Sequence, residues 1–511
     1  MKTKTRIASL ILLIALAFAS ISILAGCAKD PTPKPNDTHD TAQTGNTPDG
    51  PSSDPAGSSE NTSTEETVPT FVDADYQGAS FVIRARKETA SSYPSEYLVS
   101  DDPSDIVKSQ VIKRNDAIKN KYNVVVEVQE VDDPYKQVAT LIETGDIDFD
   151  VILDSRCRMA TIAKNGNLYN FNKLKNVNLT ASYWDANAYE QYTISNKLFF
   201  MPNDISVSNF GRVRCLFYNR DLVTDYKIED PQNLLDQNKW TLEEFLKLAT
   251  SVSSDEDGNG TWTVDDVFGA FIEEGSSNGS ILSLVTGCGI QYTKTNDEGR
   301  LAININNEKT TTVLEKISNS FKSSTAITTI QSITKTGDSS GFANNYDYAR
   351  NLFANGHALF IWANPAMTVQ FDGANFGVLP NPKYDEGQKF YFHRMDPYAL
   401  IFAIPNSSKI NYEKVANVME FGGYTSSQTV IKAYYENVLQ GRRVKTPKDA
   451  EILDLIKNSI RYEITDIFSL GIPSILDTAY TSGNFASTIK TMSGPVSKNI
   501  TKLYEDIDNI N

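Results

Sequence analysis

Short apolar runs alternate with amphipathic stretches along the chain from Phe71 onward. β-Branched and aromatic residues gather in the short runs, which is typical of strands, and the stretches between them carry apolar residues at helical spacing. A strand, helix, strand, helix, strand order indicates parallel strands with helices on both faces. The predicted elements are strands at 80–84, 124–128 and 148–153, a helix at 104–120, and a second helix opened by Pro134.

The third predicted strand is followed directly by polar residues. In parallel sheets flanked by helices, ligands bind beyond the carboxyl ends of the strands. Asp154, Ser155 and Arg156 lie at this point, so we expect Asp154 and Arg156 at a ligand-binding edge. A surface ion pair is the alternative for either side chain, because Arg and Asp commonly pair at such positions.

The remainder of the chain continues this alternation and then becomes helical. A helix is predicted from Leu242, where Thr241 and Glu244 form a capping box and apolar residues line one face. Strands and helices alternate over residues 264–380, and the region from Tyr412 is mostly helical. The expected fold class is therefore α/β.

The first 26 residues have the composition of an export signal. A basic head precedes an apolar run over residues 7–24, and a transmembrane helix is the alternative on length alone. The run ends in Leu-Ala-Gly-Cys at residues 24–27, which resembles the bacterial lipobox, where the Cys is acylated and becomes the new N-terminus. We therefore predict a lipoprotein signal peptide at 1–26, with Cys27 as the lipidation site.

Residues 27–69 form the predicted lipid anchor and tether. Six prolines lie among Ser, Thr, Asp and Gly over residues 28–68, with no Leu, Ile, Met or aromatic residue. Such a segment buries too little apolar area to offset its ordering entropy, which predicts a disordered tether. The mature protein is thus expected on the extracellular face of the cell membrane, attached to the membrane through its N-terminal lipid alone.

The charge and the composition restrict the possible functions. The chain has 48 Lys plus Arg against 64 Asp plus Glu, a formal net charge of −16, and such an acidic surface excludes nucleic acid as the main partner. Three His and four Cys leave little room for a zinc cage or a disulfide framework. We expect Cys157, Cys215 and Cys288 to be buried packing residues.

Residues 255–266 have the spacing of an EF-hand calcium loop, with Gly260 at the sixth position. Oxygen ligands in alternation suit Ca²⁺, but Asp266 stands where the loop normally has a bidentate Glu, so the expected affinity is modest. An acidic, Gly-rich turn without metal is the alternative. The predicted ligands of a structural Ca²⁺ are Asp255, Asp257, Asn259, the Thr261 carbonyl, Thr263 and Asp266.

Two stretches, 275–279 and 337–341, match the G-x-S-x-G pattern of serine hydrolases. His357 and His393 lie downstream of the first stretch as conceivable bases. Both stretches occur among repeated Ser and Gly residues, which produce such matches by chance. A hydrolase is therefore the weakest alternative, and we expect the chain not to be an enzyme.

Several segments, taken in order, resemble a known family. They read LFFMPNDISVSNFGRVRCLFYNRDLV, KWTLEEFLKLA, LFANGHALFIWANPAMTVQ, FGVLPNPKYDEGQKFYF, YALIFAIPNSSKINYEKVANVMEF, YYENVL and AEILDLI. This order resembles the extracellular solute-binding proteins of ABC importers, the maltose-binding-like group, in a Gram-positive subgroup assigned to oligosaccharide uptake. The resemblance spans residues 71–511.

The resemblance implies a two-lobed, periplasmic-binding-protein-like fold. Each lobe would be a mostly parallel sheet flanked by helices, and a carbohydrate, most simply an oligosaccharide, would bind in a cleft that closes by a hinge motion. The implied partners are the permease subunits of an ABC importer, with the chain acting as a monomer. By analogy, lobe 1 is predicted at 70–205 plus 400–442 and lobe 2 at 210–395 plus 445–511, with crossings near 204–212, 393–404 and 440–447.

A sugar site needs flat aromatic rings and planar polar groups. Residues of both kinds occur at the predicted strand ends and crossings. The predicted ligand contacts are Asp154, Arg156, Trp184, Asp185, Asp204, Trp362, Asn364, Arg394 and Asp396. Core packing is the alternative for each Trp. A surface glycan sensor or an adhesin on the same fold is the alternative function, which the sequence does not separate from import.

Overall fold

The computed structural model describes residues 68–87, 97–275, 279–371, 373–436 and 446–510, which belong to one compact unit. The predicted signal peptide, Cys27, the tether up to residue 67 and residues 440–445 of the third predicted crossing lie outside the described residues. Within these ranges, every helix is too short or too polar to cross a membrane.

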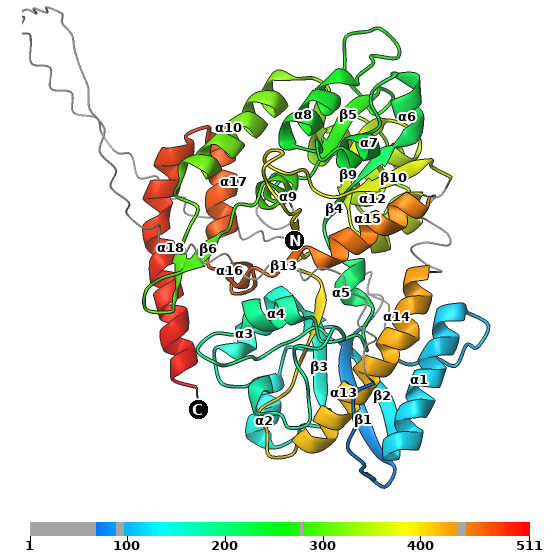
Figure 1. Cartoon of the computed structure of the whole chain (residues 1–511), viewed down its shortest axis with the longest axis vertical. Coiled ribbons are helices and arrows are strands. Elements are labelled where there is room, and N and C mark those ends of the chain that lie inside the picture. Colours follow the sequence, from blue (N-terminus) through cyan, green and yellow to red (C-terminus); the bar gives the residue numbers. More distant parts are fainter. Residues whose placement is uncertain (1–67, 88–96, 276–278, 372, 437–445, 511) are drawn as a thin grey trace, which may run out of the picture. The chain divides into compact units, whose positions relative to one another are not determined.

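The secondary structure alternates between strands and helices along most of the described chain (Figure 1). The strands are β1 (Ala79–Arg86), β2 (Val124–Val131), β3 (Val151–Ser155), β4 (Cys215–Asn219), β5 (Phe268–Ile272), β6 (Thr293–Thr295), β7 (Leu301–Ile303), β8 (Ile327–Thr329), β9 (Ala358–Ala363), β10 (Phe376–Leu379), β11 (His393–Arg394), β12 (Leu400–Ala403) and β13 (Ile460–Arg461). The α-helices are α1 (Ile106–Tyr122), α2 (Val138–Thr144), α3 (Arg156–Ala163), α4 (Ala186–Tyr192), α5 (Ser208–Gly211), α6 (Arg220–Asp225), α7 (Pro231–Asp236), α8 (Leu242–Ser251), α9 (Ser280–Gly287), α10 (Glu308–Ser323), α11 (Ile330–Ile333), α12 (Asn345–Ala354), α13 (Tyr412–Gln428), α14 (Val430–Ala433), α15 (Pro447–Asn458), α16 (Ile464–Ile467), α17 (Ile472–Ser482) and α18 (Phe485–Asp508), and the 3₁₀-helices are η3 (Phe171–Lys173) and η4 (Pro365–Phe371).

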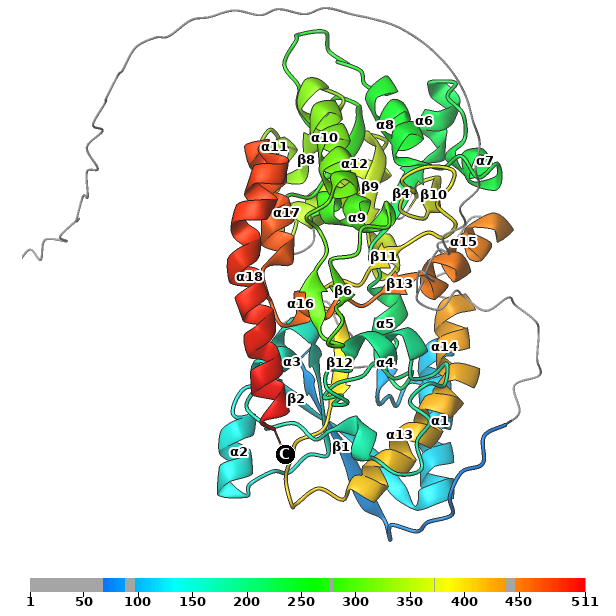
Figure 2. The same cartoon turned by 60° about the vertical axis from the view of Figure 1, so that its left-hand side comes forward.

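The sheet of the first lobe has four strands in the order β12-β3-β1-β2. β1 pairs in parallel with β2 and β3, and β12 joins the edge antiparallel to β3. The edge strand β2 begins with alternating buried and exposed residues, whereas every residue of β3 is buried. Helices α1, α13 and α14 pack against one another beside this sheet, as Figures 1 and 2 both show.

The sheet of the second lobe has five strands in the order β10-β4-β9-β5-β8. β5 pairs in parallel with β8 and β9, while β4 pairs antiparallel with β9 and β10. The expectation of a mostly parallel sheet is therefore confirmed for the first lobe, but the second sheet is mixed. α8 passes so close to β5 that a Cβ on Gly269 would lie 1.7 Å from the Ala249 carbonyl oxygen, which only glycine permits.

Two segments that run between the sheets pair with each other. The Arg214 amide donates to the Arg394 carbonyl at 2.9 Å, and the Asp396 amide donates to the Arg212 carbonyl at 3.1 Å. The first segment follows Met201 toward β4, and the second leads from β11 into β12. We call residues 205–214 and 394–399 the crossing segments. Beside them, β11 pairs in parallel with β13.

The last helix, α18, contacts residues from early and late parts of the chain. It packs against α17, α10 and β7 (Figure 2), and Asp508 near its end pairs with Arg300 at 3.0 Å. At the same end, the Lys197 ammonium donates to the carbonyls of Ile507 at 2.8 Å and Asp508 at 3.2 Å. The lysine thus satisfies acceptors that a helix leaves free at its C-terminus.

Local predictions are confirmed except at the third strand and at two helix starts. β1, α1 and β2 occur where expected, and residues from Tyr412 are mostly helical, but β3 begins at Val151 rather than at 148 and includes Asp154 and Ser155, which were predicted to follow it. The helix predicted to open at Pro134 is wrong, because α2 begins only at Val138, after a left-handed residue at Gln137. Thr241 caps α8 as expected, but the reciprocal bond of a capping box is not formed and Glu244 binds Lys247 instead.

Candidate functional site

The carboxyl ends of β1 and β3 carry a connected set of charged side chains. Arg86 lies 3.1 Å from Asp133 and 3.5 Å from Asp154, and Arg158 lies 3.4 Å and 3.8 Å from the same two carboxylates. Burial raises the pKa of Asp154, although the Ser155 amide and Arg86 oppose this shift. One buried oxygen of Asp154, Oδ2, has no partner among the described residues. The predicted edge is therefore polar and held in place by several contacts.

Arg156 is as buried as Asp154 and contacts a different element. Its side chain is 2% exposed, and its guanidinium carbon lies 6.0 Å from the centre of the Tyr192 ring of α4. Its Nε and Nη1 atoms have no partner among the described residues. The structure thus places the Arg156 side chain in the interior, against α4.

The strand ends of the second sheet carry a similar set of paired polar groups. Glu273, directly after β5, is buried and pairs with Arg214 at 2.5 Å. Burial raises the pKa of Glu273, while Arg214 and Arg350 oppose the shift. Directly after β9, the Asn364 side-chain amide donates to Asp396 at 3.0 Å. The structure therefore brings two predicted contacts, Asn364 and Asp396, together.

Two exposed tyrosines lie among these polar groups, and the sequence prediction missed both. Tyr346 is 38% exposed and Tyr398 is 44% exposed. Burial raises the pKa of Tyr398, and Cys157 and Asp396 raise it further. The pKa of Tyr346 is raised by burial and then by Glu273, with a smaller contribution from Tyr398. We call Tyr346 and Tyr398 the tyrosine rim.

The two tryptophans predicted to contact ligand are instead inside the lobes. Trp184 is fully buried, its ring packs edge-on against Phe171, and its Nε1 donates to Glu420 at 2.7 Å. Trp362 is 1% exposed, and its Nε1 donates to Asn381 at 3.0 Å. Neither indole presents a ring face to solvent, so the structure favours core packing over stacking for both.

The Arg394 side chain also lies in the interior of the protein. It is 3% exposed and pairs with Asp466 of α16 at 2.6 Å. Burial alone would lower the pKa of Arg394, but Asp466 and Tyr292 raise it overall. The ion pair joins the start of the second crossing segment to the C-terminal helices and leaves Arg394 no open surface for a ligand.

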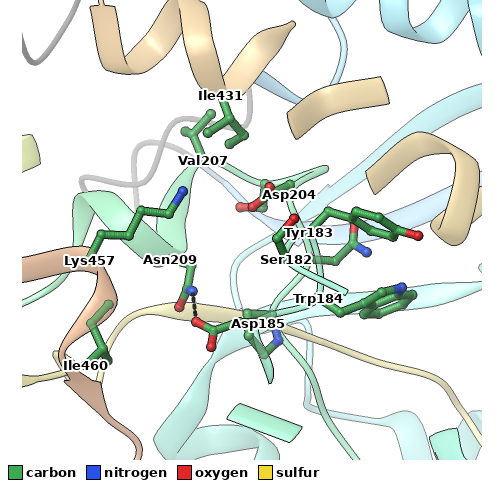
Figure 3. Close-up of a pocket in the computed structure, with 13 residues that line it drawn as sticks. Ser182, Tyr183, Trp184, Asp185, Asp204, Val207, Asn209, Ile431, Lys457 and Ile460 are labelled. Carbon is green, nitrogen blue, oxygen red and sulfur yellow. Dashed lines mark hydrogen bonds between the residues drawn. The ribbon is translucent and has the colours of Figure 1, made fainter. Parts of the chain in front are cut away.

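The remaining predicted contacts, Asp185 and Asp204, lie together at a pocket (Figure 3). Asp185 accepts from Asn209 at 3.1 Å and from the Tyr462 hydroxyl. Burial raises the pKa of Asp204 to about 7, with Lys457 opposing and Asp185 reinforcing the shift. We call this the crossing pocket. It is lined by Ser182, Tyr183, Trp184, Asp185, Pro202, Asn203, Asp204, Ser206, Val207, Asn209, Ile431, Lys457 and Ile460.

The predicted calcium loop brings its acidic residues together. Carboxylate oxygens of Asp255, Asp257 and Asp266 lie within 4.8 Å of one another. The Gly260 amide donates to Asp255 at 2.7 Å, and this bond is the main reason that the pKa of Asp255 is lowered. The other oxygen of Asp255 is buried and has no partner among the described residues. The residues present therefore fit a hard cation.

The cysteines are unpaired in the described chain. Cys215 and Cys288 are buried, as expected of packing residues. Cys157 is half-buried, and its thiol lies 3.8 Å from the Ser155 hydroxyl. Burial raises the pKa of Cys157, so the thiolate is disfavoured at the start of α3.

Solved structures with the same fold bind sugars. They include an ABC substrate-binding protein from Listeria monocytogenes in complex with cycloalternan (13% identity, 84% of this chain and 100% of that chain, TM-score 0.52). Others are a solute-binding protein of an ABC transporter from Thermotoga lettingae TMO bound with α-D-tagatose (14%, 83% and 100%, 0.51) and the maltose-binding protein MalE from Listeria monocytogenes with maltose (15%, 83% and 98%, 0.52). At these identities the matches establish the two-lobed fold.

The sequence itself matches a family. No curated protein sequence matches the chain. The profile of the family described as bacterial extracellular solute-binding protein matches residues 113–420, more than half of the chain. Members of this family bind solutes and are not enzymes. The chain belongs to the bacterial extracellular solute-binding protein family.

Proposed function

We propose that the chain binds a neutral carbohydrate at the tyrosine rim and delivers it to an ABC importer. The observation that carries this proposal is the exposure of two tyrosines, Tyr346 and Tyr398, whose pKa values respond to Glu273, directly after β5, and to Asp396 of the second crossing segment. Tyrosine rings offer flat apolar faces for the axial hydrogens of a sugar. The carboxylate and amide groups around them offer planar hydrogen bonds for its hydroxyls.

The charges near the rim favour a neutral ligand. Arg86 and Arg158 are matched by Asp133 and Asp154 on the first lobe, and Arg214 is matched by Glu273 on the second. A carboxylated sugar or a polyamine would have to compete with these internal ion pairs. The sugar ligands of the solved structures with this fold support the same class.

The test of this proposal is a glycan panel read by thermal shift and calorimetry. A ligand that binds only the folded state raises its melting temperature, and a hundredfold excess over Kd corresponds to about 2.7 kcal/mol of added stability. Neutral oligosaccharides should raise the melting temperature, while uronates and polyamines should not. Binding of a peptide or a polyamine, with no glycan binding, would remove the carbohydrate assignment and leave the family intact.

Delivery to an importer requires attachment near the permease, for which we propose acylation of Cys27. Cys27→Ala should leave an uncleaved or released protein in place of a membrane-bound mature one. Detergent partitioning and intact mass measure this directly. Partitioning and mass that match the unchanged protein would contradict the lipid anchor.

We also propose a structural Ca²⁺ in the 255–266 loop, supported by the clustered carboxylates and the unpartnered oxygen of Asp255. The expected ligands are Asp255, Asp257, Asn259, Thr261, Thr263 and Asp266. Chelator should lower the melting temperature, and Asp255→Ala with Asp257→Ala should abolish this dependence. Asp265→Ala, an exposed position of the same loop, is the matched control and should keep it.

A further inference from the structure

Asparagine followed by glycine can lose its side-chain ammonia without an enzyme. The glycine has no side chain that would obstruct attack of its amide nitrogen on the carboxamide of the asparagine. Asn-Gly occurs four times in the sequence, and at three of these positions the structure describes both residues. The three pairs are Asn165-Gly166, Asn259-Gly260 and Asn355-Gly356. Their surroundings differ, and the difference decides which of them can react in the folded chain.

The pair at 355–356 is held in the turn that ends α12. The Gly356 amide donates to the Phe353 carbonyl at 3.1 Å, and the Asn355 carboxamide donates to the Asn351 carbonyl at 2.9 Å. These bonds attach the attacking nitrogen and the carboxamide to the helix separately, so the end of the helix must open before they can meet. The acceptor of the glycine N–H is also a carbonyl, which does not take up its proton.

The pair at 165–166 is held in a similar way just after α3. The Gly166 amide donates to the carbonyl of Ala163, the last residue of α3, at 3.2 Å. The Gly166 carbonyl accepts from the Asn406 side chain at 3.1 Å. Both sides of the glycine are therefore fixed, and the acceptor of its N–H is again a carbonyl.

The pair at 259–260 lies in the proposed calcium loop and has different contacts. The Thr261 amide donates to Asn259 Oδ1 at 2.5 Å, which folds the carboxamide over the Asn-Gly peptide bond and polarises its C=O. The Gly260 amide donates to Asp255 at 2.7 Å, so a carboxylate lies where the proton of the attacking nitrogen must go. Asn259 and Gly260 are both exposed, and a Cβ on Gly260 would meet no heavy atom within 4 Å.

We propose that Asn259 deamidates in the folded, calcium-free chain, and that it does so faster than Asn165 and Asn355. The Gly260 nitrogen forms a bond with Cγ of Asn259 and gives up its proton through Asp255. The Cγ–Nδ2 bond breaks, and ammonia leaves with this proton. Water then opens the succinimide ring, adding hydroxyl to one of the two carbonyl carbons and hydrogen to the nitrogen. The product is aspartate or isoaspartate at position 259.

Deamidation would change the cation site proposed for this loop. Isoaspartate inserts a methylene into the main chain directly before Gly260, whose amide now orients Asp255. Aspartate adds a negative charge beside Asp257, which accepts from the Asn259 carboxamide at 2.5 Å. Bound Ca²⁺ would instead hold Asn259 Oδ1 and Asp255 as ligands and should protect Asn259. The protection rests on the proposed Ca²⁺ site, whereas the deamidation does not.

The test follows the three pairs in one sample of the full chain. The protein is incubated at neutral pH with chelator or with excess Ca²⁺, and mass spectrometry of its separated peptides measures the loss of each asparagine. With chelator, Asn259 should convert at least about tenfold faster than Asn165 or Asn355, a conservative value for one positioned donor or base. In urea, where only the local sequence acts, the three rates should become similar. Excess Ca²⁺ should slow conversion at Asn259 alone.

Two variants test the contacts of the loop. Asp255→Asn should slow conversion at Asn259 about tenfold, because it removes the acceptor of the proton. Asp265→Asn, which changes an exposed carboxylate of the same loop, is the matched control and should leave the rate unchanged. An unchanged rate in Asp255→Asn would overturn the assigned proton transfer.

The outcomes separate this proposal from the calcium proposal. Equal rates at the three pairs in the folded chain, or faster conversion at Asn165 or Asn355, would overturn the assignment of Asn259. If Asn259 converts fastest and Ca²⁺ does not slow it, the deamidation site stands and the proposed Ca²⁺ site fails.

Discussion

The buried tryptophans and the tyrosine rim use aromatic rings in opposite ways. Trp184 and Trp362 lie inside the two lobes, and each indole N–H is satisfied by a buried side chain, Glu420 or Asn381. Tyr346 and Tyr398 are 38% and 44% exposed, so a large part of each ring is open. A sugar can stack only on a face that the protein leaves uncovered, so the open tyrosines are the better candidates for ligand contact.

The largest expected effect in this comparison is on stability. Trp362→Ala should lower the free energy of unfolding by about 3–5 kcal/mol, because it leaves a cavity against Phe245 and a buried Asn381 without its donor. Chemical denaturation measures this loss. Tyr398→Ala, measured in parallel, should change the unfolding free energy by less than about 0.5 kcal/mol. Equal losses of unfolding free energy in both variants would contradict the distinction between a buried tryptophan and an exposed tyrosine.

The interior should also respond to acid through His393. The Asn381 amide donates to His393 Nε2 at 3.0 Å, and His393 Nδ1 contacts the Ser459 hydroxyl at 2.7 Å. Burial lowers the pKa of His393 to about 3. Below pH 6.5 this histidine is protonated in the unfolded chain but stays neutral in the native protein. The free energy of unfolding therefore falls by about 1.4 kcal/mol per pH unit because of this residue. His393→Gln should flatten the stability curve between pH 6.5 and 4.5; an unchanged slope would contradict this account.

The Glu420 carboxylate, which binds Trp184, should contribute less to the free energy of unfolding than a buried tryptophan ring does. Glu420 accepts from Trp184 at 2.7 Å, from the Tyr183 hydroxyl at 2.6 Å and from the Asn178 amide at 3.1 Å. Glu420→Gln keeps the shape but turns one acceptor into a donor, at an expected cost of about 1–3 kcal/mol. Thermal denaturation of the ligand-free protein measures this loss of stability. A shift in ligand affinity without a shift in stability would instead place this group at the ligand.

The smallest expected change is in ligand-binding free energy at the tyrosine rim, and it tests the proposed function directly. Tyr398→Ala and Tyr346→Ala should each weaken binding of a responsive oligosaccharide by about 1 kcal/mol, which is about fivefold in Kd. Tyr398→Phe keeps the ring and should bind nearly as the unchanged chain does. Phe390→Ala is the matched control, since Phe390 is equally exposed, at 44%, but lies outside the strand ends. If calorimetry gives the same Kd for all four variants, the tyrosine rim does not contact the ligand.

The sequence predicts the positions of the elements well because their signals are local. β1 and β2 follow their β-branched runs, and α1 begins where Asp105 accepts from the amides of Val107 and Lys108. The antiparallel pairs of the second sheet could not be predicted in this way. They depend on how β4, β9 and β10 come together from distant parts of the chain. The spacing of apolar residues within one strand does not reveal which strands will lie beside it.

The site was harder to predict than the fold. A tryptophan at a strand end looks the same in sequence whether its ring faces solvent or a neighbouring core, and Trp362 faces the core because Phe245 and Asn381 cover it. Tyr346 carried a weak local signal, since Asn344 caps α12 and places Tyr346 in its first turn. Asn364 and Asp396 were predicted separately, and their contact is a property of the fold.

The position of β12 has a consequence for how this chain reaches its native state. The sheet of the first lobe is complete only when β12 pairs with β3, and β12 follows the whole second sheet in the chain. Pairings between such distant segments carry a large loop-closure cost and slow the search for the native topology. During synthesis, the outer edge of β3 must therefore wait, unpaired, until the ribosome has released residues 400–403, and a chain that stops earlier cannot finish its first lobe.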